Sequence, residues 1–300
     1  MSLASSLIAL VGVAARRPVG LKGGTATIPA IEKRQRFVVD AGWLRAYRHV
    51  VGAVDDGLLP PCAPQVLASP LHTQILGDKR FPLPALGMVH VENRIDELAP
   101  IAMRGGLALD VTARVAGHVL HDRGVTFDIV TTVELDGATV WTSTMTALVR
   151  AQAAGVPKQE PKAKQDKPRP TAIGSVLSSS TVRVPADQGR RYARVSGDAN
   201  PIHLSALSAK PFGFPRAIAH GMWTLARALS EVHDALPPGA ASPRRIDCRF
   251  VRPVLLPSTI VVDARVIDGA RGVALHVMPE RKDRKGAPHL VGSIVPLPSA

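Results

Sequence analysis

The sequence predicts an α+β fold built from two copies of one unit, in which a long helix is followed by a run of antiparallel strands. Three observations lead to this prediction. The segment Ala151–Pro170, rich in Pro, Lys, Gln and Ala, lacks apolar periodicity and divides the 300 residues into near-equal halves. Short matching segments recur in the same order in both halves. In each half, a helical pattern precedes stretches that alternate between apolar and polar residues.

The repeat rests on two pairs of matching segments. YRHVVGAVDDGLLP begins at Tyr47 and YARVSGDANPIHLS begins at Tyr192, and their Tyr, Val and Gly residues fall at the same places. Further along, NRIDELAPIAMRGGLALDVTARV begins at Asn93 and resembles CRFVRPVLLPSTIVVDARV, which begins at Cys248. Small insertions and deletions therefore separate two copies of one unit.

The copies set the expected elements and boundaries. We expect an N-terminal segment at 1–30, a first copy at 31–150, a linker at 151–170 and a second copy at 171–300. Helices are predicted over Pro64–Leu76 and Ala217–Leu236, and the second has one apolar face formed by Met222, Leu225, Leu229 and Val232. The predicted strands are LALDVTARV, VTFDIVTTVEL and TVWTSTMTALV in the first copy, and RIDCRFVRPV, TIVVDARVI and VALHVMP in the second.

The composition narrows the functional classes. Hydrophobic residues make up 46% and aromatic residues only 4%, so the core must be mainly aliphatic. Cys62 and Cys248 match no metal-ligand spacing and indicate buried thiols in a reducing cytoplasm. The net charge of +13 is spread without a basic helical stripe or interleaved aromatic residues, which argues against nucleic-acid binding. This charge favours a phosphate-bearing partner such as coenzyme A or an acidic carrier protein.

The apolar run Leu7–Ala15 near the N-terminus has the wrong context for a signal peptide. Arg16 and Arg17 follow the run instead of preceding it, and the run is too short to span a bilayer. We expect a terminal helix that packs on the protein and no integral membrane segment.

The stretch from Asp198 to His203 is the strongest candidate for a functional site. Taken alone, Asp and Asn before Pro are typical of a turn. However, Pro201 restricts Asn200 to extended geometry, and a sharp turn there can bring the carboxylate and the imidazole to face one small volume. An acid and an imidazole that share a water could move protons between adjacent carbons.

The first copy supports a catalytic interpretation of this pair. It has Ala53 in place of Asp198 and Leu58 in place of His203, although neighbouring positions match. A turn needed for folding should recur in both copies, whereas a catalytic pair need not. The sequence thus predicts that the second half is catalytic and that the first half supports it.

Gly221 lies at the start of the apolar-striped helix, where unpaired backbone N–H groups could polarise a carbonyl. A tight helix start would also require a small residue, so both interpretations stay open. His220 beside it is more typical of a packed or hydrogen-bonded histidine than of a catalytic one. The histidine spacing predicts no metal site, and there is no Gly-rich phosphate loop or G-x-S-x-G elbow.

YARVSGDANPIH, followed by GFPRAIAHGM, resembles the signature of (R)-specific enoyl-CoA hydratases in the family of MaoC-like dehydratases. From Arg36 onward, the chain resembles the two-hotdog form of 3-hydroxyacyl-thioester dehydratases. This implies a tandem (double) hotdog, each a long central helix wrapped by an antiparallel sheet, with an inactive first copy. It also implies reversible conversion of a trans-2-enoyl thioester into a (3R)-hydroxyacyl thioester, carried on coenzyme A or acyl carrier protein, in fatty-acid-type metabolism. No metal or redox cofactor is implied.

The resemblance also assigns roles to residues. Asp198 and His203 correspond to the catalytic pair, Asn200 supports the same site, and the amide of Gly221 holds the thioester carbonyl. Many relatives have an acidic residue where this chain has Ser205. The first copy, without the pair, could instead line a longer pocket for the acyl tail.

Two other functions stay open. Hotdog thioesterases usually place a carboxylate on the central helix, and Met222–Ala226 offers none. A non-catalytic acyl-thioester-binding subunit would not need the intact acid–imidazole pair. Two hotdogs in one chain already form the pair that the fold usually makes as a homodimer, so a monomer or a homodimer is expected.

Overall fold

The computed structural model describes residues 27–85, 87–150, 173–236, 243–267, 272–280 and 287–297. The apolar run Leu7–Ala15 and the predicted linker Ala151–Pro170 lie outside these ranges. Within them, no helix is both long and apolar enough to cross a membrane.

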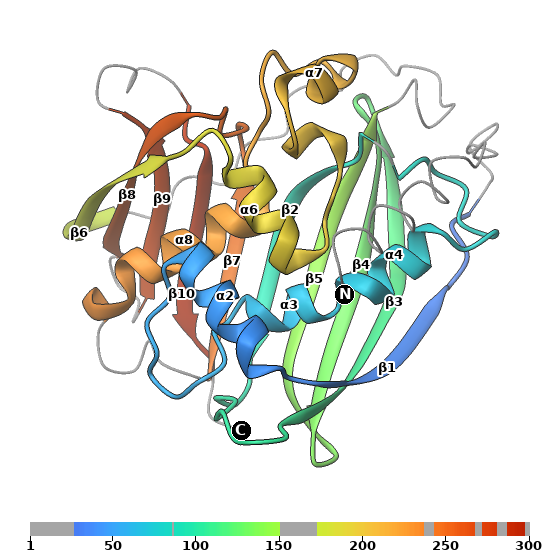
Figure 1. The fold of residues 1–300 in the computed structure, drawn as a ribbon, viewed down its shortest axis with the longest axis horizontal. Helices are drawn as coiled ribbons and strands as arrows, with labels where there is room; N and C mark the ends of the chain where they lie inside the picture. Colours follow the sequence, from blue (N-terminus) through green and yellow to red (C-terminus); the bar gives the residue numbers. More distant parts are fainter. Residues whose placement is uncertain are drawn as a thin grey trace.

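One 10-stranded antiparallel sheet runs through both halves of the chain, and the helices lie on one of its faces (Figure 1). Its strand order is β1-β3-β4-β5-β2-β7-β10-β9-β8-β6, so the second five strands repeat the first five in reverse. The strands of the first half are β1 (Glu32–Val38), β2 (Val89–Glu97), β3 (Ala108–His121), β4 (Gly124–Leu135) and β5 (Ala138–Arg150). Those of the second are β6 (Ile173–Val184), β7 (Arg244–Phe250), β8 (Ser258–Ile267), β9 (Gly272–Pro279) and β10 (Leu290–Pro296).

The six predicted strands are confirmed as β3, β4, β5, β7, β8 and β9. The sequence analysis did not identify β1, β2, β6 or β10. β7 ends at Phe250 rather than Val254, because the chain leaves the sheet there and Val251 N–H donates to the carbonyl of His289.

The two halves meet at β2 and β7, and matching residues of the repeat meet there as well. Asn93 lies opposite Cys248, the two residues at which the matching segments begin. On either side, Arg94 pairs with Asp247 at 2.7 Å and Arg249 pairs with Glu92 at 3.4 Å. This register is that of a local two-fold axis, and it agrees with the repeat found in the sequence.

The long helix predicted for the second half is α8 (Gly221–Val232), which is shorter than the predicted range Ala217–Leu236. Its predicted apolar face is buried, with Leu225 and Val232 fully enclosed. The residues before Gly221 are extended, because Ala219 N–H donates to Val254 O and Leu256 N–H donates to Ala217 O. These pairings place the helix start at Gly221.

The prediction of one long central helix in the first half is wrong. Pro64–Leu76 forms two short helices instead, α3 (Ala63–Leu67) and α4 (Ser69–Leu76). A continuous helix would need an N–H at position 70 to bond the carbonyl of Val66, and Pro70 has none. The break therefore follows from the sequence.

Two further helices, α2 (Ala41–Val51) and α6 (Gln188–Ser196), contain the matching tyrosines of the repeat. Each ends at a left-handed glycine, Gly52 with φ 75° and Gly197 with φ 73°. Glycine is favoured there because a side chain would be strained at positive φ. The shared Tyr–Val–Gly pattern is thus a helix with its C-terminal cap.

α2 packs against α6, and tryptophans join the helices of the two halves. Trp43 Nε1 donates to Val195 O at 2.8 Å, and Trp223 Nε1 donates to Val50 O at 3.0 Å. Val50 and Val195 are equivalent in the repeat. The helices are held so that the C-terminal end of α6 lies beside the start of α8, where the predicted site residues lie.

Candidate active site

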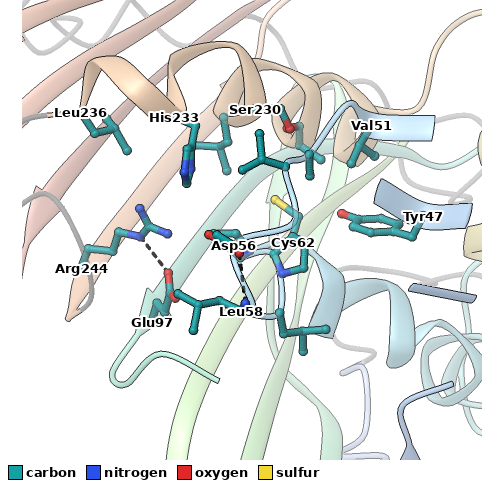
Figure 2. A pocket seen from close by; sticks show the side chains of 17 residues that line it. Tyr47, Val51, Asp56, Leu58, Cys62, Glu97, Ser230, His233, Leu236 and Arg244 are labelled. Carbon is teal, nitrogen blue, oxygen red and sulfur yellow. Dashed lines mark hydrogen bonds and ion pairs between the residues drawn. The ribbon is translucent and has the colours of Figure 1, made fainter. Parts of the chain in front are cut away.

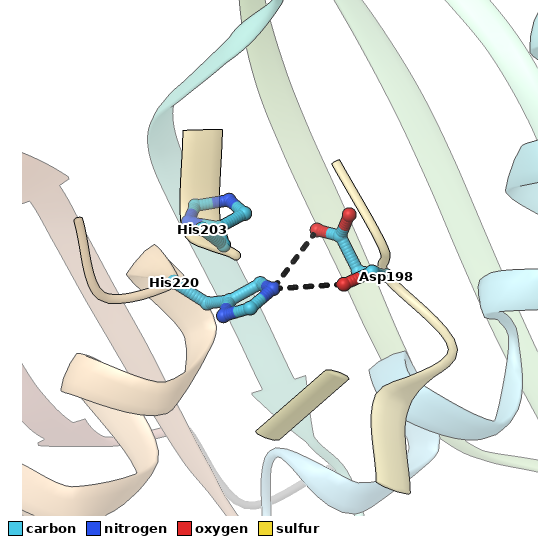
Figure 3. A group of neighbouring side chains, drawn as sticks. All are labelled: Asp198, His203 and His220. Carbon is cyan, nitrogen blue, oxygen red and sulfur yellow. Dashed lines mark hydrogen bonds and ion pairs between the residues drawn. The ribbon is translucent and has the colours of Figure 1, made fainter. Parts of the chain in front are cut away.

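Asp198, His203 and His220 come together from three separate segments (Figure 3). Asp198 follows the glycine cap of α6, His203 ends a 3-10 turn over Pro201–His203, and His220 directly precedes α8. One ligand-type atom of each lies within 4.8 Å of the others. The structure therefore joins the two residues predicted as a pair and adds a third.

The turn between Asp198 and His203 has the predicted geometry. Asn200 is extended, with φ −54° and ψ 127°, as a residue before proline should be. Its N–H donates to Asp198 Oδ1 at 3.1 Å, which closes the turn and orients the carboxylate. Asn200 itself is buried, and its Oδ1 accepts no hydrogen bond from any described residue.

His203 is held in one orientation by the backbone. Its Nδ1 lies 2.8 Å from the carbonyl oxygen of Ile218, which can only accept. Nδ1 therefore carries the proton, and in the neutral ring Nε2 keeps a lone pair for a reacting proton. This is the tautomer that a general base requires.

His220 contacts both members of the pair. Its Nε2 donates to Asp198 O at 3.0 Å and lies 3.8 Å from Asp198 Oδ2. Its ring stacks on that of His203, with centroids 3.6 Å apart and planes inclined by 23°. The sequence interpretation of a packed, hydrogen-bonded histidine is confirmed, but it missed that the partners are the catalytic candidates. The adjacent A-H-G-M segment was the signal that could have included it.

The cluster has residue types that can bind metals, but its geometry fits proton transfer better. The two imidazoles are stacked, so their in-plane lone pairs run side by side instead of converging. An ion bonded to both rings would lie well outside both ring planes, contrary to the in-plane bonding of metal-bound histidine.

Burial and mutual contact set the charges of the cluster. The desolvation of Asp198 within the cavity would by itself raise its pKa, but His220, His203 and the Asn200 N–H hold that pKa below its ordinary value. Burial lowers the pKa of His203, against the opposing effect of the Asp198 carboxylate. Burial and the neighbouring His203 lower the pKa of His220 to about 3. At neutral pH the site thus holds a carboxylate and two uncharged imidazoles.

Buried neutral histidines make stability depend on pH. Burial holds the pKa of His72 at about 4 and, with His203, that of His220 at about 3, whereas the ordinary value is 6.5. Below pH 6.5 the unfolded chain binds protons that the folded chain does not. The free energy of unfolding should then fall by about 1.4 kcal/mol per histidine for each pH unit. Urea unfolding at pH 7, 6 and 5 measures this slope, and the variant His220→Gln should flatten it. An unchanged slope in that variant would contradict the assignment.

Gly221 is the first residue of α8, so its N–H has no acceptor within the helix. A Cβ built at this position would lie 3.1 Å from ring atoms of Phe250, tighter than ordinary packing allows. Glycine therefore leaves room beside the exposed end of a helix dipole, where a polarised carbonyl oxygen can bind.

The cluster opens into a cavity of about 410 Å³. Both halves line it: the second supplies the cluster, Asn200 and Gly221, and the first supplies one face of α3 and α4. The suggestion that the first copy lines the pocket agrees with this arrangement. Three exposed arginines, Arg123, Arg150 and Arg252, also line the cavity and form no ion pair with a described residue.

Ser205 stands where relatives of the resembled family often have an acidic residue. Its Oγ accepts from the N–H of Ser208 at 3.1 Å and caps the short helix α7 (Ala206–Ala209). The serine thus has a local structural role at the edge of the site.

The first half keeps a small counterpart of this cavity, of about 70 Å³ (Figure 2). Tyr47, Ala53 and Leu58 line it at the places equivalent to Tyr192, Asp198 and His203. Its charged groups form structural pairs instead: Arg244 Nε lies 2.7 Å from Glu97 Oε2. Asp56 and His233 also line this cavity, but the two places equivalent to Asp198 and His203 hold neither an acid nor an imidazole.

Comparison with known proteins identifies relatives of the whole chain. A family model described as MaoC like domain matches residues 153–284, which include the three clustered residues. The 3-hydroxyacyl-thioester dehydratase X of Mycobacterium tuberculosis is 34% identical over 262 residues, which cover 87% of each chain. The crystal structure of HtdX (Rv0241c) of Mycobacterium tuberculosis matches with a TM-score of 0.72 and 30% identity, over 90% of this chain and 100% of that one.

A more distant structure identifies the fold. Rv0216 of Mycobacterium tuberculosis, described as a double hotdog, matches with a TM-score of 0.56 and 15% identity, over 91% of this chain and 97% of that one. Together with the ten-stranded sheet, this match confirms the predicted tandem hotdog.

Proposed function

Because the chain belongs to the MaoC-like dehydratase family, we propose that it interconverts a trans-2-enoyl thioester and a (3R)-hydroxyacyl thioester by adding or removing water. The observation that carries this proposal is the pairing of Asp198 with His203 on one cavity, with Gly221 at a helix start in the same cavity. We further propose that residues 31–150 form the non-catalytic hotdog and residues 171–300 the catalytic one.

The hydration step follows from these groups. The Asp198 carboxylate and the lone pair of His203 hold a water, and one of them takes its proton as the oxygen bonds to C3. The electron pair of the C2–C3 double bond moves toward the thioester carbonyl, whose oxygen gains negative charge. The Gly221 N–H stabilises that charge, and C2 then takes a proton from the pair. Dehydration is the same path reversed.

Asn200 and His220 would support this step without exchanging the reacting protons. The free Oδ1 of Asn200 can accept a hydrogen bond from the bound water. The His220 ring fixes the positions of Asp198 and His203 relative to each other. In our assignment Asp198 and His203 are therefore the catalytic residues, and His220 is a positioning residue.

A thioesterase on the same fold is the competing activity, and one assay separates the two. Purified protein is mixed with trans-2-enoyl-CoA while enoyl-thioester absorbance and free thiol are followed together. We expect absorbance to fall without thiol release, and chiral analysis to give the (3R) product. Thiol release with the double bond intact would establish hydrolysis instead. Binding without either change would indicate a non-catalytic subunit.

The acyl group is carried on coenzyme A or on an acyl carrier protein. The three exposed arginines that line the cavity favour a carrier with a phosphate-bearing arm. Arg150 lies over the ring of Phe214, with its guanidinium carbon 5.9 Å from the ring centroid, and Arg252, which follows β7, lines the same cavity. Exposed guanidinium groups without carboxylate partners are well suited to phosphate.

Removing two of these arginines tests whether the cavity recognises a phosphate on the carrier. The double variant Arg150→Ala/Arg252→Ala should raise KM for an enoyl-CoA by about tenfold or more, with kcat little changed. KM for the matching N-acetylcysteamine thioester, which has no phosphate, should stay the same. Arg183→Ala, on an edge strand away from the cavity, is the matched control. Equal effects on both thioesters would contradict phosphate recognition.

We expect one chain to be sufficient for activity, since both halves of the site come from the same polypeptide. Both cysteines are free and buried, in keeping with the cytoplasmic location predicted from the sequence.

A further inference from the structure

One face of α3 and α4 lines the active-site cavity, and most of its residues are polar. It presents Gln65 on α3 and Ser69, His72 and Thr73 on α4, together with the apolar Val66 and Leu76. The neighbouring face of the same helices, formed by Ala68, Leu71 and Ile75, is buried in the apolar core. A pocket for an unsubstituted hydrocarbon tail would be expected to be apolar on both faces.

Gln65 is the member of this face whose hydrogen bonding is incomplete. It is only 3% exposed, and its Oε1 accepts no hydrogen bond from any described residue. A buried carbonyl oxygen without a donor destabilises the protein unless a water or a ligand supplies one. Gln65 lines the cavity, although Oε1 itself is enclosed in this conformation, so its amide must turn toward the cavity to meet a ligand.

The other polar residues of this face are uncharged. His72 Nε2 lies 2.9 Å from Thr131 Oγ1, and burial holds the pKa of His72 at about 4, so its ring is neutral. Thr73 Oγ1 donates to Ser69 O at 3.0 Å. The wall therefore favours an uncharged hydrogen-bonding group over a carboxylate or a phosphate.

Other parts of the cavity wall are apolar. Met88, Val89, Met145 and Leu148 line the same cavity. A chain that fits both features is a hydrocarbon interrupted by a single uncharged oxygen substituent.

We propose that the acyl chain accepted by this cavity carries a hydroxyl group beyond C3, and that Gln65 Oε1 accepts a hydrogen bond from it. The inference rests on the proposed function, because the polar face shares its cavity with Asp198 and His203. Through Gln65, the non-catalytic half selects the substrate of the catalytic half. An unsubstituted chain leaves Gln65 without a donor and is discriminated against.

The test compares two trans-2-enoyl-CoA series of equal length, one unsubstituted and one with a hydroxyl at successive carbons beyond C3. We expect wild type to prefer one hydroxylated isomer over the unsubstituted chain by about tenfold in kcat/KM, because a buried acceptor would otherwise stay unpaired. Gln65→Met, which keeps the length of the side chain, should abolish that preference. Gln74→Met, on the exposed side of α4, should retain it.

Crotonyl-CoA separates failure of this inference from failure of the function. Its chain has no carbon beyond C4, so wild type should hydrate it whether or not the cavity recognises a hydroxyl group. Crotonyl-CoA turnover with no preference for any hydroxylated isomer would overturn the inference and leave the function intact, with an ordered water as the partner of Gln65. Hydration of no substrate at all would overturn both.

Discussion

Asp198→Asn should lower kcat for hydration by about a thousandfold, because an amide cannot accept the proton that a carboxylate accepts. The fold should be retained. The Asp198 side chain is 49% exposed toward the cavity, and the amide oxygen of Asn can still accept from Asn200 N–H. KM should change little, since we propose that the thioester carbonyl binds elsewhere, at Gly221.

His203→Gln should give a loss of similar size, and the double variant should be little worse than either single one. Groups that act together on one water are not additive, because removing either disables the pair. Stopped-flow absorbance of an enoyl-CoA measures kcat, and circular dichroism verifies folding. Losses that multiply in the double variant would show that the two residues act independently.

His220→Phe should lower kcat by about a hundredfold while leaving KM near the wild-type value, because positioning of reacting groups affects the chemical step. Phenylalanine keeps a ring to stack on His203 but removes the N–H that holds Asp198 O at 3.0 Å. Without that bond, the segment after the α6 cap is free to shift the carboxylate.

His220→Gln is the matched comparison, because its side-chain amide keeps a donor close to the place of the imidazole Nε2. It should retain most of the activity that Phe loses. If Gln and Phe variants lose activity equally, the stacked ring is the important feature and the hydrogen bond is not. If neither loses activity, His220 has no positioning role.

The pair that we propose as catalytic could be found in the sequence because its geometry is local. Pro201 determines the backbone of Asn200, and the short turn then limits where Asp198 and His203 can lie. The first copy has Ala53 and Leu58 at the equivalent places. This comparison within one chain indicated that the acid and the imidazole are not needed for folding.

His220 could not be given its role in the same way, because its contacts depend on how the start of α8 packs beside the end of α6. Both helices are positioned through contacts distant in sequence, such as Trp223 Nε1 with Val50 O. Sequence periodicity carries no information on such packing.

The helices also differ in how far nearby residues in the sequence determine them. The break at Pro70 could have been predicted, since proline removes a hydrogen bond of the helix. The sequence analysis instead followed the apolar pattern of Pro64–Leu76 and predicted one continuous helix. α6 was missed because its composition is polar, with Arg190, Arg191 and Arg194 in one short helix. It is stabilised by burial of Tyr192 and Ala193 against the rest of the fold, which is a tertiary effect.

The most direct test of the central claim follows the oxygen of water. Wild-type protein is incubated with trans-2-enoyl-CoA in ¹⁸O-labelled water, and the product is fragmented by mass spectrometry. The proposed hydration places the label on C3 of an intact (3R)-hydroxyacyl thioester. The variant Asp198→Asn should incorporate the label far more slowly than wild type. Label found in a released carboxylate, with C3 unlabelled, would contradict the account.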